Sequence, residues 1–442
     1  MKAASLRLFF VNRYFHPDHS ATSQMLSDLA FALAKRGHRI TVVTSRLGYE
    51  DPLARYPRRE TVRGVDIVRV PTTRFGRAGL AGRAIDYVTF YLATAWALLL
   101  AARRGDVIVA KTDPPLLGLV TMPVARLRGA RQVNWLQDIF PEVAIELGVG
   151  KALVWRILFS ALRRWRDRVL RKSILNVVIG ERMADVVRRT GVPPERVRAI
   201  PNWADGKVVR PVPAEANGLR QAWGLDDTFV VGYSGNLGRA HDIATMIDAM
   251  ALTEAGIAGH AGALRMAVGA SPVRQPASGK PIAWLFVGGG AKMGVLRDEV
   301  RQRHNVRAHF HAYQPREQLA ESLSVPDVHL ITLHPGLEGL VVPSKYYGIA
   351  AAGRPAIFIG DPEGEIGRIL TRTQTGFVVA AGDSEGLART ILSLAADPQL
   401  ALEYGRRARA LLERAYDLPF AVSAWENLIS DVSSEGRTET KP

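Results

Sequence analysis

The chain contains two successive series of short apolar runs, each separated from the next by a polar loop and a helical period. Leu6–Val11 predicts a strand, Met25–Arg36 has helical spacing that Gly37 ends, and Ile40–Thr44 predicts a second strand. Strand, loop, helix and strand in this order form a βαβ unit, which implies a parallel sheet and a right-handed crossover. The series continues to Val197–Ile200. We therefore predict an α/β doubly wound sheet, whose ligands lie at the carboxyl ends of its strands.

The pattern restarts after Asn202. Three prolines at 201, 211 and 213 indicate a linker, and Phe229–Tyr233 and Ile282–Val287 begin a second series of strands. A chain of 442 residues is long enough for two such domains. We predict an N-terminal domain over 1–205, a C-terminal domain over 206–415, a helix over 416–432 that crosses back to the first domain, and a disordered tail over 433–442.

Charge is unevenly distributed along the chain. The net charge is +16, and residues 151–190 hold 11 Lys and Arg against 3 acids, a net +8. Residues 151–172 combine apolar residues at helical spacing with arginines and Trp165, which is typical of a helix on a membrane surface but also of a solvated face over a core. The apolar segment Ala84–Ala102 predicts a buried or surface-lying helix rather than a span. The chain has no cysteine, which excludes disulfides.

The segment from His334 to Pro355 predicts an anion site. A buried strand ends at Leu333, and an Ala-rich helix that begins with Ser344 and Lys345 follows a loop. Free backbone N–H groups and the helix dipole favour phosphate there, and the lysine adds a full charge. Gly235, Asn236 and Gly238 lie in another strand–helix turn, where glycines let the backbone approach a pyrophosphate. An ordinary strand–helix–strand unit is the alternative for each segment.

The His334–Pro355 segment resembles the donor-binding segment of family 4 retaining glycosyltransferases, and the resemblance extends over about residues 5–430. It implies a GT-B fold, in which two doubly wound Rossmann-like domains face each other across a cleft. It also implies departures from the family pattern, since the places of the usual cationic pair are Asn236 and His241 here, and neither expected glutamate position, Leu340 or Gly348, is acidic. Either Glu338 or Glu365 is then expected to accept the ribose hydroxyls, and we favour Glu365. The turn containing Tyr313 and Gln314 is expected to contact the base.

The first domain is expected to supply the acceptor side. Asp138 follows a strand and resembles the acidic motif of the family, which implies that it orients the sugar or the acceptor hydroxyl. The alternative is that Asp138 caps the next helix, and Glu142 is a weaker candidate. The loop that opens the first helix is expected to contact acceptor or phosphate through small and polar side chains, namely His16, His19, Ser20 and Thr22.

The resemblance implies a glycosyltransferase of hexosyltransferase type that moves a sugar from a UDP- or GDP-linked donor. The expected acceptor is a lipid-linked saccharide for a surface polysaccharide, such as lipopolysaccharide or exopolysaccharide. We expect a cytoplasmic enzyme that lies on the anionic inner face of the cell membrane, with no metal and no other cofactor. Two alternatives remain open: a sugar-nucleotide 2-epimerase with the same two domains, and a basic protein that binds membranes or nucleic acid. We expect no nucleic-acid partner, because no aromatic platform accompanies the basic residues.

Overall fold

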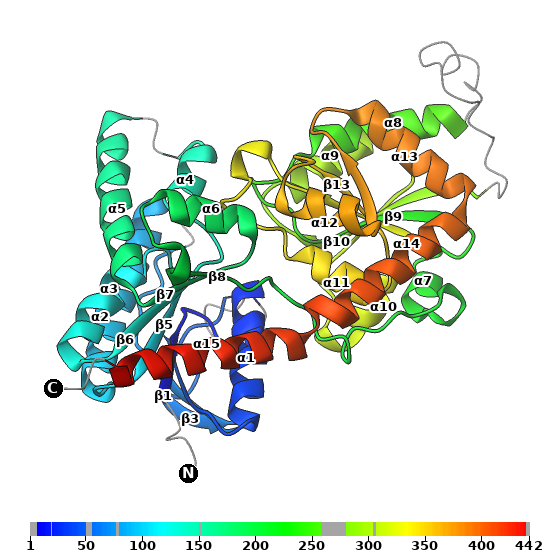
Figure 1. The fold of residues 1–442 in the computed structure, drawn as a ribbon. Coiled ribbons are helices and arrows are strands. Elements are labelled where there is room, and N and C mark those ends of the chain that lie inside the picture. Colours follow the sequence, from blue (N-terminus) through cyan, green and yellow to red (C-terminus); the bar gives the residue numbers. More distant parts are fainter. Residues whose placement is uncertain are drawn as a thin grey trace. The chain divides into compact units, whose positions relative to one another are not determined.

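The computed structural model describes residues 7–18, 20–49, 55–76, 79–149, 152–257, 280–303 and 306–438 (Figure 1). The chain forms two compact units. The first consists of Met1–Asn202, Gly339–Val341 and Leu418–Pro442, and the second of Trp203–Glu338 and Val342–Asp417. The expected loop residue His19 lies outside the described residues.

The sheet of the first unit has the strand order β3-β4-β2-β1-β5-β6-β7-β8. Every neighbouring pair is parallel except β3 with β4. The order reverses between β1 and β5, which makes their carboxyl ends the topological switch point of this unit. The strands are β1 (Arg7–Val11), β2 (Arg39–Ser45), β3 (Arg59–Val62), β4 (Val65–Val70), β5 (Val107–Lys111), β6 (Arg131–Trp135), β7 (Leu175–Val178) and β8 (Val197–Ala199).

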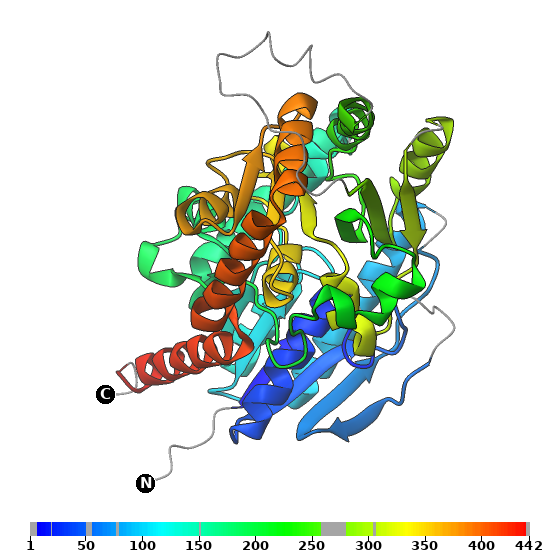
Figure 2. The same cartoon turned by 90° about the vertical axis from the view of Figure 1, so that its right-hand side faces the viewer.

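Helices cover both faces of this sheet, because side chains alternate along each strand. On β1, Phe9 packs into a cluster with Phe90 of α2, whereas its neighbour Phe10 contacts Trp425 of α15. Figures 1 and 2 show α15 beside α1, and Arg36 pairs with Glu426 between them. The helices are α1 (Ala21–Lys35), α2 (Leu80–Ala101), α3 (Gly118–Arg128), α4 (Glu142–Glu146), α5 (Leu153–Lys172), α6 (Glu181–Arg189) and α15 (Leu418–Thr438).

The second unit repeats this topology. Its six strands are all parallel, in the order β11-β10-β9-β12-β13-β14, so its switch point lies between β9 and β12. The strands are β9 (Phe229–Asn236), β10 (Ile282–Gly289), β11 (Ala308–His311), β12 (Val328–Thr332), β13 (Ala356–Ile359) and β14 (Gly376–Val379). The helices are α7 (Gly218–Ala222), α8 (Ala244–Ile257), α9 (Met293–Gln302), α10 (Leu319–Ser324), α11 (Lys345–Ala351), α12 (Glu365–Thr373), α13 (Ser384–Ala396) and α14 (Pro398–Leu411).

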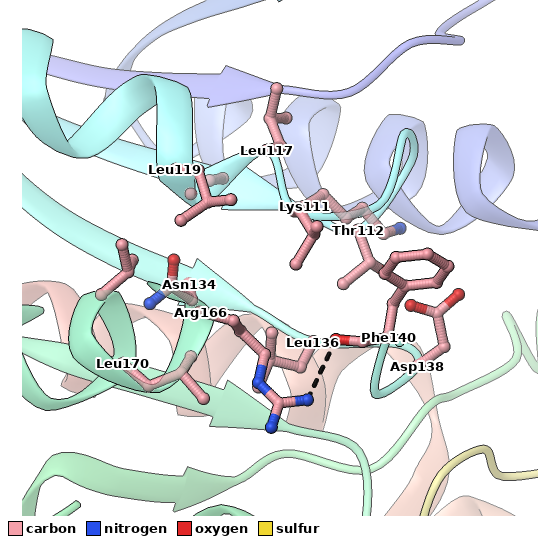
Figure 3. A pocket seen from close by; sticks show the side chains of 14 residues that line it. Lys111, Thr112, Leu117, Leu119, Asn134, Leu136, Asp138, Phe140, Arg166 and Leu170 are labelled. Carbon is pink, nitrogen blue, oxygen red and sulfur yellow. Dashed lines mark hydrogen bonds between the residues drawn. The ribbon is translucent and has the colours of Figure 1, made fainter. Parts of the chain in front are cut away.

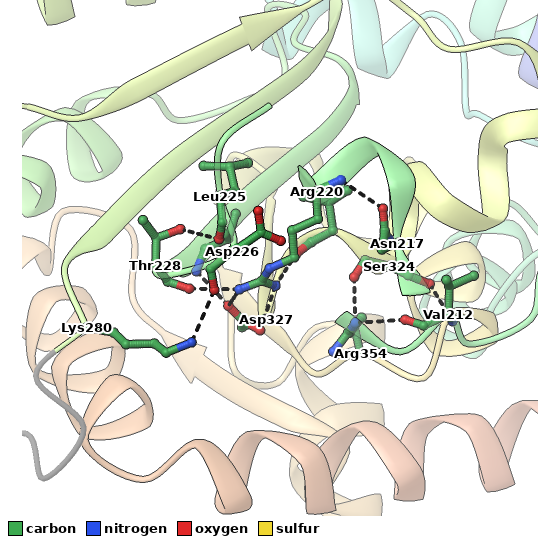
Figure 4. A network of polar contacts seen from close by, with 12 residues as sticks. Val212, Asn217, Arg220, Leu225, Asp226, Thr228, Lys280, Ser324, Asp327 and Arg354 are labelled. Carbon is green, nitrogen blue, oxygen red and sulfur yellow. Dashed lines mark hydrogen bonds and ion pairs between the residues drawn. The ribbon is translucent and has the colours of Figure 1, made fainter. Parts of the chain in front are cut away.

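A buried polar network joins α7 to the segments that precede β9 and β12 in the second unit (Figure 4). The guanidinium of Arg220 donates to both carboxylate oxygens of Asp327, at 3.1 Å each, and to the carbonyl of Thr228 at 2.7 Å. Arg354 is also buried and donates to the carbonyl of Ser324 at 2.5 Å. The Gly353-Arg354 turn after α11 is therefore structural: Gly353 has a φ of +65° and ends the helix, and Arg354 anchors it.

The unit boundaries differ slightly from the predicted domains, since the chain passes between units at 202–203 and 417–418. One prediction is wrong. The tail expected to be disordered from residue 433 continues α15 as far as Thr438. The physical reason is that Trp425, Ile429 and Val432 recur at helical spacing and are buried in the first unit, so their burial stabilises the helix up to this region.

Candidate functional site

The turn after β9 lies at the switch point of the second unit and is shaped by glycine. Gly235 has a φ of +118°, which a side chain would strain, and a Cβ there would lie 2.8 Å from Cε of Lys345. On the neighbouring strand β10, a Cβ on Gly288 would lie 2.4 Å from the carbonyl oxygen of Gly235. The ends of β9 and β10 therefore approach each other more closely than any other residue type allows.

Hydrogen bonds on both sides hold this turn in place. The N–H of Leu237 donates to the carbonyl of Gly289 at 2.7 Å, and that of Lys292 donates to the carbonyl of Leu237 at 3.0 Å. On the other side, the N–H of His334 donates to the carbonyl of Ala240 at 2.9 Å. The turn is thus a fixed backbone surface before any ligand arrives.

Lys345 places its charge against this surface. It begins α11, as predicted, and its Nζ donates to the carbonyl of Asn236 at 3.3 Å and lies 5.0 Å from the ring centre of Tyr233. Burial lowers the pKa of Lys345 to about 8. The ammonium therefore remains largely protonated at neutral pH, and its incomplete solvation favours an anionic ligand.

His241 does not supply a second cation. Its Nδ1 lies 2.8 Å from the carbonyl oxygen of Thr332, and its ring packs edge-on against Tyr233. Burial, and then the charge of Lys345, lower the pKa of His241 to about 4. A neutral imidazole bonded to β12 positions the turn, whereas Asn236 has no charge to offer.

The other residues expected to contact the donor lie in two places, before α11 and after β11. Ser344 is exposed and precedes α11, where its side chain makes no capping hydrogen bond. Tyr313 is 53% exposed beyond β11, and its ring edge would lie 3.4 Å from a Cβ on Gly289. The amide of Gln314 donates to the carbonyl of Ala312 at 2.9 Å, within its own turn. Tyr313 thus lies next to the glycines of β10 and offers an accessible ring.

The two acids considered for the ribose lie together. The Oε1 of Glu338 accepts a hydrogen bond at 2.8 Å from the backbone N–H of Glu365, the first residue of α12. A Cβ on Gly364 would lie 2.4 Å from Oε2 of Glu338, so glycine is required for this approach. Glu338 therefore occupies the N-terminus of α12, where the helix dipole favours its charge. The structure brings the pair together but does not choose between them.

In the first unit, Asp138 follows β6 at the carboxyl edge of the sheet. It does not cap the next helix, because Pro141 occupies the position before α4. Its Oδ1 is buried without a hydrogen-bond partner. Burial, and then the charge of Asp113, raise the pKa of Asp138 to about 7, although a hydrogen bond from Thr112 opposes this. A carboxyl group with one unpartnered oxygen and a pKa near neutrality can hold or accept a proton.

The sequence analysis missed Asp113, which follows β5 at the switch point. Its carboxylate accepts a hydrogen bond from Oγ1 of Thr22 at 3.3 Å, and its carbonyl accepts one from the N–H of Arg13 at 2.6 Å. Burial raises the pKa of Asp113 to about 6, against the opposing charge of Arg13. The signal for this residue was available in the sequence, because Asp113 follows the apolar run 107–110, and an acid after a central strand occupies the position that ligands use.

A hollow adjoins Asp138 (Figure 3). Its empty volume is about 420 Å³, counting the space at its mouth. Leucines from the loop after β5, together with Leu136, Phe140 and Leu170, make its lining mostly apolar. Arg166 also borders it, but its guanidinium is engaged by Glu142, Asp167 and the carbonyl of Phe140. Apolar walls around one carboxyl group explain why the charged form of Asp138 is disfavoured.

The other first-unit candidates have structural contacts. The His16 ring packs edge-on against Phe31 at 5.4 Å. Ser20 precedes α1, and its buried hydroxyl has no partner. Thr22 joins two elements, because its hydroxyl donates to Asp113 and its carbonyl accepts from Nζ of the buried Lys111 at 2.7 Å. Glu142 pairs with Arg163 and Arg166 and therefore holds α4 to α5.

The chain is similar in sequence to known glycosyltransferases. Residues 21–203 match the family model described as "Glycosyl transferase 4-like domain". The chain is 27% identical over 391 residues to WbjE of Pseudomonas aeruginosa, named as a probable glycosyltransferase, with 87% of this chain and 88% of that one covered. It is 23% identical over 376 residues to WcaI of Escherichia coli strain K12, whose name assigns it to colanic acid biosynthesis, covering 83% and 86%.

Two solved structures share the fold. Sucrose-phosphate synthase of Thermosynechococcus elongatus aligns with a TM-score of 0.72 at 18% identity, over 97% of this chain and 100% of that one. HepE of Anabaena, in complex with UDP-glucose, aligns with a TM-score of 0.66 at 15% identity, over 96% and 100%. These structural alignments show that the fold is shared. At such low identities they say nothing about the chemistry, which rests on this chain's own residues.

Proposed function

We propose that this chain, a family 4 glycosyltransferase with the GT-B fold, transfers a sugar from a nucleotide-sugar donor to a hydroxyl of a lipid-linked saccharide. The reaction retains the anomeric configuration of the sugar, and the product contributes to a surface polysaccharide. The observation that carries the proposal is the Lys345 ammonium held against the glycine turn of β9, at the switch point of a Rossmann-like sheet.

The second unit binds the donor in this proposal. The donor diphosphate lies against the backbone at Gly235–Gly238, where the absence of a side chain at Gly235 permits close approach. Lys345 and Ser344 at the start of α11 stabilise the negative charge that develops on the leaving diphosphate. Asn236 offers a neutral amide, and neutral His241 keeps the turn on β12.

The nucleoside part is assigned to the residues around this turn. Tyr313 has an exposed ring that can stack on a base, with Gln314 beside it. Glu365 is our candidate for the ribose hydroxyls. Its neighbour Glu338 already accepts a hydrogen bond from the backbone at the start of α12, which commits that carboxylate in part to the helix. The donor is UDP- or GDP-linked, and HepE, which has the same fold, was solved with UDP-glucose.

The first unit supplies the acceptor groups. Asp138 orients the acceptor hydroxyl through its unpaired Oδ1, and Ser20, Thr22 and the His16–His19 loop contact the acceptor or a phosphate. In the transfer step, the bond from the anomeric carbon to the diphosphate oxygen breaks while the bond to the acceptor oxygen forms on the same face. The proton of the acceptor hydroxyl passes to the leaving phosphate. No metal or other cofactor takes part.

The setting is the inner face of the cell membrane. A lipid-linked acceptor is anchored there, and the basic segment 151–190 would be attracted to anionic lipid. The arginines of α5 support this placement, because several are exposed beside the exposed Trp165. Assignment to polysaccharide biosynthesis is supported by the similarity to WcaI.

Thermal-shift measurements with a panel of nucleoside diphosphates and nucleotide sugars test the donor site. A ligand that binds only the folded state adds about 2.7 kcal/mol to the free energy of unfolding when its concentration is a hundred times Kd, and this raises the melting temperature. We expect a shift with one base, unchanged by a chelator and absent in Lys345→Ala. Lys207→Ala, at an exposed lysine of the same unit, should keep the shift. A panel that shifts nothing, in folded protein, would contradict the proposal.

A further inference from the structure

The helix α2 (Leu80–Ala101) has an inverted distribution of polarity between its two faces. The inner face, formed by Asp86, Phe90, Thr94 and Leu98, is no more than 2% exposed and includes an acid and a hydroxyl. The outer face carries large apolar side chains that are 48–68% exposed, namely Ile85, Val88, Leu92, Trp96 and Leu100. We call these five residues the α2 stripe. In water the apolar face of a helix normally lies inward, so the stripe needs a cover.

The inner face explains why α2 cannot leave the first unit. The carboxylate of Asp86 accepts hydrogen bonds from Oγ1 of Thr73 at 2.7 Å and from the N–H of Phe75 at 2.9 Å, and pairs with Arg13 at 3.5 Å. Phe90 and Leu98 belong to the core cluster of the unit. Residues 81–101 are apolar and long enough to cross a membrane. Crossing would break these contacts, so α2 stays docked and presents one face.

The dimensions and flanking charges of the stripe fit a bilayer surface. The rise from Ile85 to Leu100 is about 22 Å, so the α2 stripe is a continuous apolar strip along one side of a docked helix. Asp86, turned inward, is the only charged residue between Arg83 and Arg103. Exposed Arg83, Arg103 and Arg104 bracket the stripe and complement anionic headgroups, and Trp96 has the mixed character that interfaces favour.

The first unit exposes further apolar side chains on two other helices. In the first unit α2 contacts α3, and α3 contacts α5 (Figure 1). Leu127 of α3 is 76% exposed, and the first turns of α5 expose Leu153, Val154 and Ile157 with Arg156 among them. A second copy of the chain would have to match these repeated arginines with acids. A lipid surface with anionic headgroups satisfies apolar and basic groups at once.

We propose that the α2 stripe inserts into the apolar boundary of the lipid bilayer and holds the first unit on the membrane. The inference deepens the proposed function, since it names the surface through which the enzyme reaches a lipid-linked acceptor. Attachment then has two parts. The arginines give an attraction that salt screens, and the α2 stripe gives a contact that salt does not remove.

Vesicle flotation of the full chain tests this inference. With vesicles of phosphatidylcholine and phosphatidylglycerol, we expect wild-type binding to persist in about 0.5 M salt, where surface charges are screened within a few ångströms. The double variant Leu92→Glu with Trp96→Glu should bind at least about tenfold more weakly, because it loses apolar contact and adds like charge. The control Val295→Glu changes an exposed apolar residue of α9 and should bind like wild type.

Brominated lipids give a second reading. Bromine quenches only tryptophans within the bilayer, so the wild-type chain should lose a larger part of its emission than Trp96→Phe, which still holds the exposed Trp165. If the double variant floats like wild type, or if Trp96 is not quenched, the inference fails. It also fails if the α2 stripe variants only convert a wild-type dimer to monomer, since a second copy would then be the cover. Nucleotide thermal shifts separate this inference from the donor proposal. If the double variant keeps the shift but no longer floats, the donor proposal stands. If the wild-type chain floats but shows no shift with any nucleotide, the donor proposal alone is overturned.

Discussion

The two units share one topology and place opposite chemistry at its switch point. Both sheets reverse strand order beside their first strand, between β1 and β5 in one unit and between β9 and β12 in the other. The first unit gathers Asp113 and Asp138 there, whereas the second gathers Gly235, Gly288 and the ammonium of Lys345. In our proposal the fold fixes where a ligand lies, and the residues on the loops decide whether an anion or a hydroxyl is bound.

Removing the carboxylate of the first unit should have the largest effect. We expect Asp138→Asn to lower kcat by about a hundredfold, the scale of a lost orienting contact to the reacting hydroxyl. The nucleotide thermal shift should be unchanged, because donor binding is assigned to the other unit. Glu146→Gln, at an exposed acid after the same strand, should leave kcat near wild type. Loss of the nucleotide shift in Asp138→Asn would contradict the assignment of donor binding to the second unit alone.

Two glycines of the second unit offer a matched pair of alanine variants, one in the turn at the end of β9 and one outside it. Gly235→Ala strains a φ of +118° and brings a Cβ within 2.8 Å of Lys345, so the ammonium must move. We expect donor affinity to fall about tenfold, with a loss of stability on the order of 1 kcal/mol. The control Gly294→Ala, in α9 of the same unit, meets nothing within 4 Å and should change affinity less than about twofold. Isothermal titration calorimetry with the nucleotide found in the thermal-shift panel measures both affinities. Equal affinities would contradict the assignment of the diphosphate to the turn at Gly235.

The raised pKa of Asp138 makes stability depend on pH with a definite sign. The folded chain holds this proton up to a pKa of about 7, against an ordinary value of 3.8, so it binds more protons than the unfolded chain between these values. The contribution of Asp138 to the free energy of unfolding is greatest below about pH 4. It decreases as the pH rises to 7, by on the order of 1 kcal/mol per pH unit. Asp138→Asn should therefore gain more stability over wild type at pH 8 than at pH 5 in urea unfolding. An equal difference at both values would exclude the linkage.

Glu142 should affect only stability, although it lies in the same segment as Asp138. It pairs with Arg166, which keeps Asp167 and the carbonyl of Phe140 as other partners. We expect Glu142→Gln to cost about 1–2 kcal/mol of unfolding free energy, as for a weakened charged hydrogen bond, with kcat within about twofold of wild type. Urea unfolding and steady-state assays measure both. A large fall in kcat would place Glu142 in the acceptor site.

The order of strands and helices was predictable because local sequence encodes it. Apolar runs and helical periods located β1, β2, β8, β9 and β10, and Ser344-Lys345 correctly predicted the start of α11. The extent of α15 was missed, because its last residues are polar and continue a helix whose buried side chains come earlier. The polarity of a short segment says little about a helix that is stabilised from its other end.

The site was only partly readable. Asp138 and Lys345 stood out because each follows a strand beside a turn, and Asp113 had the same signal in a segment of prolines and leucines. The charge states of His241 and Asp138 depend on burial and on neighbours that are distant in sequence, such as Lys345 and Asp113. Spacing along the chain does not report desolvation, so their pKa shifts could not be predicted.

The sequence by itself determined that this chain forms two parallel α/β sheets, with glycines and a lysine after the strands of the second and an acid after a strand of the first. Periodicity and turn residues are local properties, and they suffice for that. Only the tertiary structure decided which face of α2 is buried. The helix turns Asp86 inward to Arg13 and Thr73 and leaves Leu92 and Trp96 outside, because partners from distant segments satisfy the acid while no described residue of the first unit covers the apolar side.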